Sequence, residues 1–196
     1  MKSWSHVLFL AIQTQVEIQH KLLIMKVTQL HSDEYAPFYA NYIKQVSDKY
    51  TLMEELEISV HRLIKFVQDI PMDKYDYRYE EGKWTIKDIL QHLIDAERIF
   101  AYRALRFARN DKTELPGFEE NAYADIANGD KRSIMDLLTE LAVVRQATLS
   151  LFKTFEEEHL LRSGIASKNN MSVRALGFVI IGHQNHHQQI FEERYL

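Results

Sequence analysis

The sequence of 196 residues contains no cysteine and few residues that favour tight turns, with only 6 Gly and 3 Pro. Without cysteine the chain has no disulfide, no thiolate nucleophile and no Cys-ligated zinc or iron–sulfur site. Any metal ion must therefore be held by His and carboxylate side chains. The scarcity of Gly and Pro leaves little turn chemistry for a sandwich or barrel of short strands, and it favours a few long helices.

The charge balance lacks a basic excess, because the formal net charge is −4. A broad positive field is the usual sign of a nucleic-acid partner, so no nucleic-acid partner is predicted. Hydrophobic residues make up 46% of the chain, which is enough for a core and argues against wholesale disorder. One domain is the expectation for a chain of this length.

Residues 1–24 are interpreted as an N-terminal extension, and residues 25–196 as the domain itself. The apolar stretch Val7–Ile12 is far shorter than the roughly 20 residues of a membrane span, and no small-residue cleavage site follows it. The extension is either flexible or a short extra helix that packs Leu8, Ile12 and Val16 on the body. Since neither a membrane segment nor a signal peptide is predicted, the cytoplasm is the expected compartment.

Apolar residues recur at spacings of three and four in four segments, which predicts amphipathic helices. These segments span about residues 40–70, 85–109, 131–158 and 173–194. Thr85 with Asp88 is a capping pair for the second segment, and Ser172 caps the fourth. The connection of residues 111–129 is long for a bundle loop, which is typical of a loop with a function or a short helix of its own. The pattern predicts an all-α four-helix bundle with one long crossover.

Nine histidines are present, and three of them are His183, His186 and His187. Positions four apart share a helix face, so His183 and His187 can hold one ion, with His183 and His186 as the alternative pair. His92, between apolar neighbours on the second segment, would supply a third ligand. The ordinary interpretation is a set of solvated or hydrogen-bonded histidines. The apolar surroundings of the last segment favour burial instead.

Two segments resemble the DinB/YfiT-like superfamily, and the resemblance covers about residues 46–196. Residues 84–97, WTIKDILQHLIDAE, are similar to the family signature W-[ST]-x-x-[DE]-x-x-x-H-[LI]-x-[DE]. Residues 182–190, GHQNHHQQI, are similar to its closing element G-H-x-x-H-H-x-x-[IQ]. The resemblance implies a DinB-like four-helix bundle with up-down-down-up topology.

The resemblance also implies a histidine triad that binds a divalent metal ion, zinc or nickel. Its ligands would be His92, His183 and His187, and His186 would be left as a pocket residue. Three His ligands from two helices leave open coordination positions, as in catalytic sites. Such an ion acidifies a bound water or thiol and polarises a substrate carbonyl. Known relatives include thiol S-transferases that use bacillithiol or mycothiol, and members proposed as hydrolases.

Charged residues surround this predicted site. Four arginines lie on the second segment: Arg98, Arg103, Arg106 and Arg109. Ion pairs with Glu140, Glu156 or Glu157 are the simpler interpretation of these arginines. The alternative is that one or two of them bind the carboxylate of a substrate or of a thiol cofactor.

Three further predictions concern the surroundings of the metal. Asp95, one helical turn from His92, is a candidate to orient an imidazole, as carboxylates behind metal ligands do. His61 is a second candidate for such a supporting role. The loop of residues 115–121 is either a lid over the pocket or a plain surface crossover.

Two functions follow from these patterns together with the family resemblance. The first is a metal-dependent enzyme acting on a small-molecule substrate, of the thiol S-transferase or hydrolase type, with a low-molecular-weight thiol as the cosubstrate of a transferase. The alternative is a non-catalytic stress-response or small-ligand-binding bundle with a structural metal. Helical bundles often pair about a two-fold axis, so a homodimer is the oligomer expected if the chain associates.

Overall fold

The computed structural model describes residues 25–196, so the extension predicted for residues 1–24 lies outside the described residues. Four long helices form the body: α3 (Leu52–Gln68), α4 (Ile86–Ala108), α6 (Ile134–Phe152) and α8 (Val173–Arg194). Shorter elements are α2 (Ala40–Ile43), α5 (Glu120–Ala127), α7 (Glu157–Leu161), β1 (Ser163–Ala166) and β2 (Asn169–Ser172). Short 3-10 turns lie at Val27–Gln29, Pro37–Tyr39, Met72–Lys74 and Gly129–Lys131.

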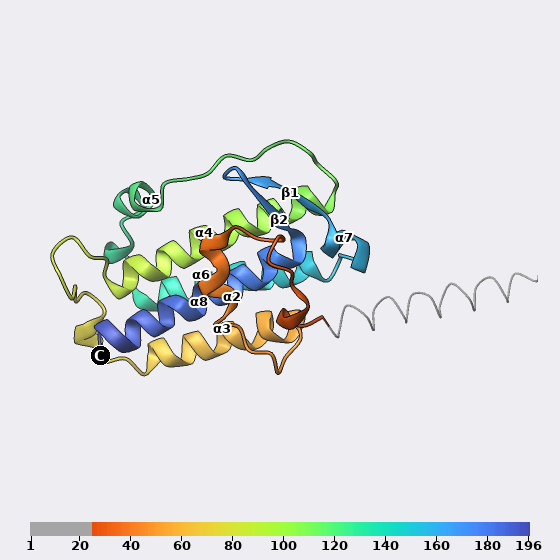
Figure 1. The fold of residues 1–196 in the computed structure, drawn as a ribbon. Coiled ribbons are helices and arrows are strands. Elements are labelled where there is room, and N and C mark those ends of the chain that lie inside the picture. The colour runs from red at the N-terminus through yellow and green to blue at the C-terminus, as the bar shows by residue number, and fades with distance from the viewer. Residues whose placement is uncertain (1–24) are drawn as a thin grey trace, which may run out of the picture.

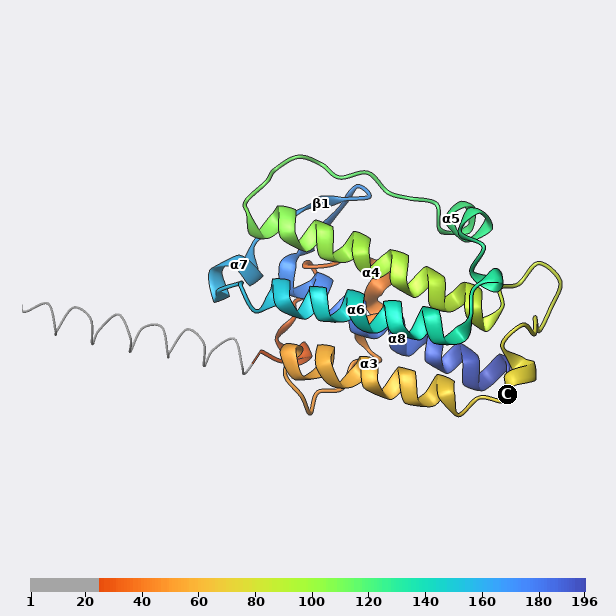
Figure 2. The same ribbon diagram turned by 180° about the vertical axis from the view of Figure 1, so that it is seen from behind.

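The four long helices lie side by side, and the chain runs along them in up-down-down-up order (Figure 1; Figure 2). Each of α3 and α4 contacts both α6 and α8. Helices α4 and α6 run in the same direction, so the segment between them must return along the whole bundle. That segment carries α5. The prediction of a four-helix bundle with one long crossover is therefore confirmed.

Local hydrogen bonds explain where the long helices begin. Thr85 accepts from the amide of Asp88 while the Asp88 carboxylate accepts from the amide of Thr85, a reciprocal capping box at the start of α4. Ser172 accepts from the amide of Ala175 at the start of α8. Both caps match the sequence prediction.

The first and third helices are shorter than predicted. The helix expected over residues 40–70 is broken, because α2 ends at Ile43 and α3 begins only at Leu52. The capping box between Thr51 and Glu54 fixes this second start. The helix expected over residues 131–158 ends at Phe152, and the separate helix α7 follows it.

The sequence did not predict the antiparallel hairpin of β1 and β2. Its two-residue turn places Ser167 and Lys168 at φ values of 50° and 65°. Two left-handed residues are what a tight hairpin turn requires, but Gly, Asn or Asp usually supplies them. The amide of Leu115 in the crossover donates to the carbonyl of Ile165, and the Ser167 amide donates to the carbonyl of Leu115. The hairpin therefore holds the start of the crossover against the bundle.

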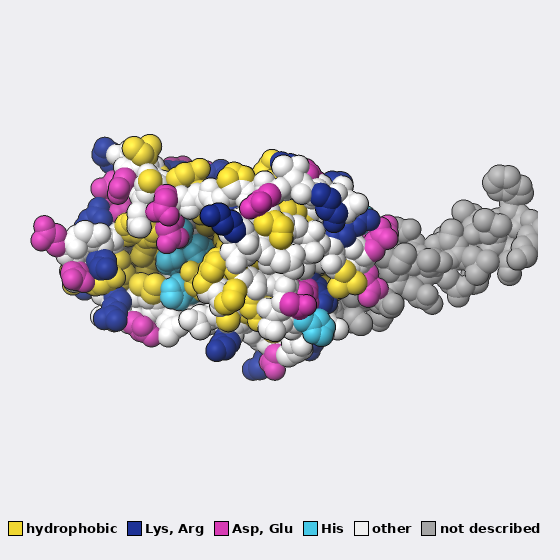
Figure 3. Space-filling view, turned by 45° about the horizontal axis from the view of Figure 1, so that its top comes forward, with side chains coloured by type: hydrophobic (Ala, Val, Ile, Leu, Met, Phe, Trp, Pro, Cys, Tyr) yellow, Lys and Arg dark blue, Asp and Glu magenta, His cyan; other side chains and the backbone are white. Residues whose placement is uncertain are grey.

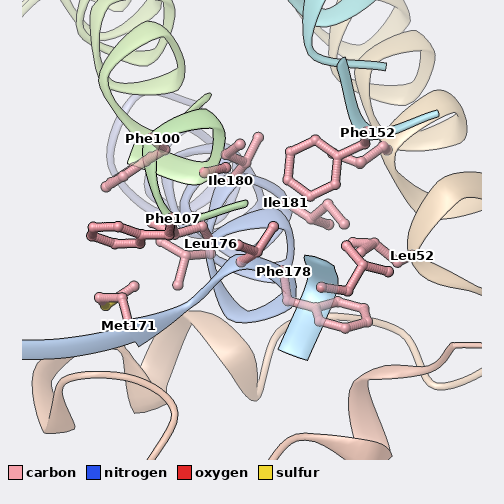
Figure 4. Close-up of a cluster of buried hydrophobic side chains, with 14 of the residues drawn as sticks. Leu52, Phe100, Phe107, Phe152, Met171, Leu176, Phe178, Ile180 and Ile181 are labelled. Carbon is pink, nitrogen blue, oxygen red and sulfur yellow. The ribbon is translucent and has the colours of Figure 1, made fainter. Parts of the chain in front are cut away.

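The core fills the space between the helices. Figure 4 shows one cluster, in which Phe100 and Phe107 of α4 and Phe152 of α6 lie around α8, with Ile180 and Leu176 between them. A second cluster fills the other end of the bundle. Within residues 25–196, none of the helices combines the length and the apolar character needed to cross a bilayer.

Candidate metal centre and its cavity

Helices α4 and α8 bring three buried histidines together. His92 Nε2 lies 2.9 Å from His183 Nε2, and His187 Nε2 lies 3.1 Å from the same atom. No ring of the three is more than 8% exposed. The structure thus places His92, His183 and His187, the three residues singled out in the sequence, around one point.

The electrostatics of this cluster keep its imidazoles neutral. Burial lowers the pKa of His92 to about 4. Burial, followed by the repulsion of the neighbouring histidines, also holds the pKa values of His183 and His187 well below 6.5. A neutral imidazole offers a free nitrogen lone pair, which is the form that binds a metal ion.

The donor set fits a divalent cation. His183 Nε2 has two close nitrogen neighbours, His92 Nε2 and His187 Nε2. A neutral ring nitrogen carries either one proton or one lone pair, so it can form a hydrogen bond with only one of them. One cation that accepts all three lone pairs would satisfy the cluster. Nitrogens bonded at 2.0–2.1 Å to tetrahedral zinc lie about 3.3 Å apart. The two distances from His183 Nε2 are close to this value, and all three ligand nitrogens lie within 4.8 Å of one another.

Aromatic rings pack against the triad. The Trp84 ring lies 4.9 Å from that of His92, and the Tyr42 ring lies 5.3 Å from that of His183. His187 Nδ1 is buried without a hydrogen-bond partner. Asp95 does not play the orienting role predicted for it, because it accepts from Gln91 Nε2 at 3.1 Å and lies 3.7 Å from Arg98.

A buried polar network that was not predicted lies behind His183. Arg145 of α6 donates to both carboxylate oxygens of Glu97 on α4, at 2.8 and 2.9 Å. It also donates to Gln184 of α8 at 3.0 Å, and to Ser59 and the Leu56 carbonyl of α3. Because Gln184 follows His183 directly, this network fixes α8 against the other three helices at the level of the triad.

A cavity of about 230 Å³ opens on one side of the triad. His92 and His183 form part of its wall, together with Phe100, Phe118 and Glu120. The carboxylate of Glu120 lies 4.0 Å from His92 Nε2 and is 58% exposed. Figure 3 shows histidine at the floor of a hollow with hydrophobic side chains around it. Phe118 and Glu120 belong to the crossover, so that segment forms part of the cavity wall.

A second hollow of about 260 Å³ lies on the other side of the triad, against His187, Trp84 and Tyr195. His186 is half-buried and stands apart from the three clustered nitrogens, with its ring 5.1 Å from that of Tyr42. His61 is exposed, so the prediction that it supports the metal site is wrong.

The arginines at and after Arg98 differ in their surroundings. The sequence left two interpretations open for them, surface ion pairs or binding of a substrate carboxylate. Arg98 pairs with Glu140 at 2.6 Å, as the simpler interpretation expected. Arg106 pairs with Asp111, and Arg109 lies 5.8 Å from the centre of the Phe155 ring. Arg103 is buried and lines the same cavity as His92 and His183.

Comparisons with known proteins agree with this fold. The sequence profile of the DinB superfamily matches residues 55–191. A protein of Oceanobacillus iheyensis is 23% identical over 72% of this chain and 82% of its own length, and one of Bacillus cereus is 24% identical over 56% and 63%. Each is named a putative metal-dependent hydrolase.

The solved structure of YfiT from Bacillus subtilis matches with a TM-score of 0.65 and 18% identity. The match covers 82% of this chain and 91% of that one. YfiT is described as a probable metal-dependent hydrolase with an unusual four-helix bundle topology. At this identity the likeness establishes the fold.

Proposed function

Because the chain belongs to the DinB superfamily, we propose that it is a metal-dependent hydrolase of small molecules. Its divalent ion, zinc or nickel, would be held by His92, His183 and His187. The observation that carries the proposal is the convergence of three buried, neutral imidazoles beside an open cavity. Transfer of a low-molecular-weight thiol would use the same ion, but the names of the relatives favour hydrolysis.

A bound ion would supply Lewis acidity, which polarises a substrate carbonyl and lowers the pKa of water. The chain supplies the surroundings. Glu120 is the carboxylate at 4.0 Å from His92 Nε2, and it is exposed enough to pass a proton to solvent. It is therefore assigned as the proton acceptor. Phe100 and Phe118 make part of the cavity wall apolar, which strengthens charge interactions beside it.

The hydrogen-bond network of Arg145 fixes the positions of the helices that carry the triad. It joins α3, α4, α6 and α8 through buried hydrogen bonds, so the helices that carry His92 and His183 hold a fixed spacing. A catalytic constellation requires this kind of support, because errors of about 0.5 Å in ligand position weaken a site.

The first test is the metal content of the untagged protein, measured by mass spectrometry. We expect about one equivalent of a divalent ion in the wild type and its loss in His92→Ala and His183→Ala. His61→Ala is the matched control, because His61 is exposed on another helix, and it should keep the ion. Protein that takes up no ion when zinc and nickel are supplied would contradict the proposal.

The second test separates catalysis from structure. Metal-loaded protein is assayed with small esters and amides, and its thermal midpoint is measured with and without the ion. Turnover that is lost in His183→Ala supports the hydrolase. A thermal midpoint that depends on the ion, without turnover of any ester or amide, would favour the alternative of a ligand-binding bundle with a structural metal.

A further inference from the structure

Three arginines in residues 25–196 are at least nine-tenths buried, and they differ in what neutralises them. Arg145 pairs with Glu97 at 2.8 Å, and Arg174 pairs with Glu34 at 2.5 Å. Arg103 is only 3% exposed, and no carboxylate oxygen of the described residues lies within 4.0 Å of its guanidinium. A buried charge is costly unless something compensates it.

The partners of Arg103 hold its side chain without cancelling its charge. Its Nη2 atom donates to the Pro116 carbonyl at 3.0 Å and to Ser167 Oγ at 3.1 Å. Burial raises the pKa of the neighbouring Tyr39 hydroxyl, and Arg103 opposes that rise. The crossover, the hairpin turn and the segment before α2 therefore all meet at one guanidinium.

The uncompensated charge faces the site. Arg103 lines the same cavity as His92 and His183, and it is the sole Lys or Arg among the residues of that wall. Arg103 and His92 are eleven residues apart on α4, which separates their Cα atoms by about 16 Å along the helix. Helical side chains lean toward the N-terminus of their helix, which is the end of α4 that carries His92.

We propose that Arg103 binds the anionic end of the substrate, and that the substrate is a small carboxylic acid with its reacting carbonyl at the opposite end. The identity of the reacting end rests on the proposed function, because the histidine triad defines it. The planar guanidinium matches a carboxylate through two parallel hydrogen bonds. A single cation suits one negative charge better than a phosphate dianion.

Size and charge narrow the substrate further. The cavity of about 230 Å³ is below the roughly 300–1,000 Å³ of sites for drug-sized ligands, so the acid is small. Glu120, near His92, repels a second negative charge at the triad end. The substrate therefore carries its charge at the Arg103 end and is neutral where it reacts.

Matched probes test this assignment by calorimetry on metal-loaded protein. The probes are glutaric acid monohydroxamate, its terminal amide, and acetohydroxamate, which presents the metal-binding group alone. We expect wild-type protein to bind the carboxylate about tenfold or more tightly than the amide. In Arg103→Gln the two affinities should come within about twofold, while acetohydroxamate binds as before.

Arg98→Gln is the matched control on the same helix. Arg98 pairs with Glu140, its side chain is 49% exposed, and it does not line this cavity. We expect the preference for the carboxylate probe to be unchanged in this variant. The thermal midpoint and the metal content of every variant are measured alongside, because Arg103 also holds Pro116 and Ser167.

Several results decide between recognition and a structural role. Equal binding of acid and amide by the wild type, or a preference that survives in Arg103→Gln, would overturn the proposal. A purely structural Arg103 would lower the thermal midpoint in the variant and leave the ratio of affinities unchanged. If Arg103→Gln does not fold, Arg103→Lys is used instead. The lysine ammonium cannot form the two parallel hydrogen bonds, so an undiminished preference for the carboxylate probe over the amide would contradict the proposal.

The same probes keep the two proposals separate. Acetohydroxamate that binds neither wild type nor Arg103→Gln contradicts the metal site, not the role of Arg103. In that case butyrate and butyramide are compared on ion-free protein by NMR titration. Butyrate binding that is lost in Arg103→Gln supports the anion site, and equal shifts with both probes overturn it.

Discussion

The backbone of α8 touches the backbone of α2 where Gly182 lies against Tyr42. A Cβ atom on Gly182 would stand 2.2 Å from the Tyr42 carbonyl oxygen and 2.5 Å from its carbon. No side chain fits at this distance without moving α2. Because Gly182 precedes His183 and the Tyr42 ring packs on the His183 ring, this contact places an aromatic wall beside the triad.

Gly182→Ala is therefore expected to destabilise the fold by about 1–3 kcal/mol, the usual cost of an added group in a packed core. Urea unfolding measures this change. Gly117→Ala is the milder comparison, because the atom nearest to its Cβ, at 3.2 Å, is the hydroxyl of the Ser167 side chain, and rotation of that hydroxyl costs only its hydrogen bond from Arg103. A Gly182→Ala protein as stable as the control would show that α2 shifts freely.

Breaking the ion pair of Arg145 and Glu97 should lower the free energy of unfolding by more than Gly182→Ala does, because both side chains are almost fully buried. Arg145→Met leaves the Glu97 carboxylate without its cation, and breaking a buried pair in this way costs about 3–5 kcal/mol. The double variant Arg145→Met/Glu97→Leu should recover part of that loss. Urea unfolding of the two single variants and the double variant measures the coupling.

The exposed pair of Lys65 and Asp69 is the control for that cycle, with side chains 74% and 63% exposed. Lys65→Met should change the free energy of unfolding by less than about 1 kcal/mol. A similar cost for Lys65→Met and Arg145→Met would mean that the buried network does not hold the helices.

The long helices were predictable because their apolar residues repeat with the helical period and their caps are local. The pair His183 and His187 was predictable for the same reason, since a spacing of four residues places both on one helix face. His92 needed the family signature, because one histidine between apolar residues is more often a hydrogen-bonded core residue than a metal ligand.

Features that depend on distant partners were not predictable. Arg145 is charged, and only the fold brings Glu97 and Gln184 to it.

Two local features were also missed. The break after α2 was missed because Val46 and Tyr50 continue the apolar spacing, although the Thr51 cap restarts the helix. The hairpin was missed because Ser167 and Lys168 are not typical residues for their left-handed turn.

Low pH should weaken the attachment of the segment that carries Glu34 to the start of α8, where Glu34 accepts from Ser172 and Arg174. Burial raises the pKa of Glu34, but hydrogen bonds from Arg174, the His31 amide and Ser172 outweigh it and hold the pKa below 4.5. A carboxyl with a lower pKa in the folded state contributes stability above the unfolded pKa, near 4.5, and loses it as pH falls through the folded value.

Glu34→Gln tests this pH dependence. At pH 7 the variant should be less stable than the wild type by about 1–3 kcal/mol, because Arg174 loses its charged partner. The difference should shrink as pH falls below 4.5. Urea unfolding at pH 7, 5 and 3.5 measures it, with exposed Glu57→Gln as the control. A difference that is constant over this range would show that the charge of Glu34 contributes nothing.

Glu120 separates proton transfer from metal binding. Its carboxylate lies 4.0 Å from His92 Nε2, within the cavity but outside the three-nitrogen cluster. Glu120→Gln should therefore keep the bound ion while kcat falls by about 10²–10⁴-fold, the usual contribution of a positioned acid or base. Glu119→Gln, the neighbouring carboxylate, should keep both. Loss of the ion in Glu120→Gln would instead make Glu120 a ligand, and unchanged kcat would assign the proton to solvent.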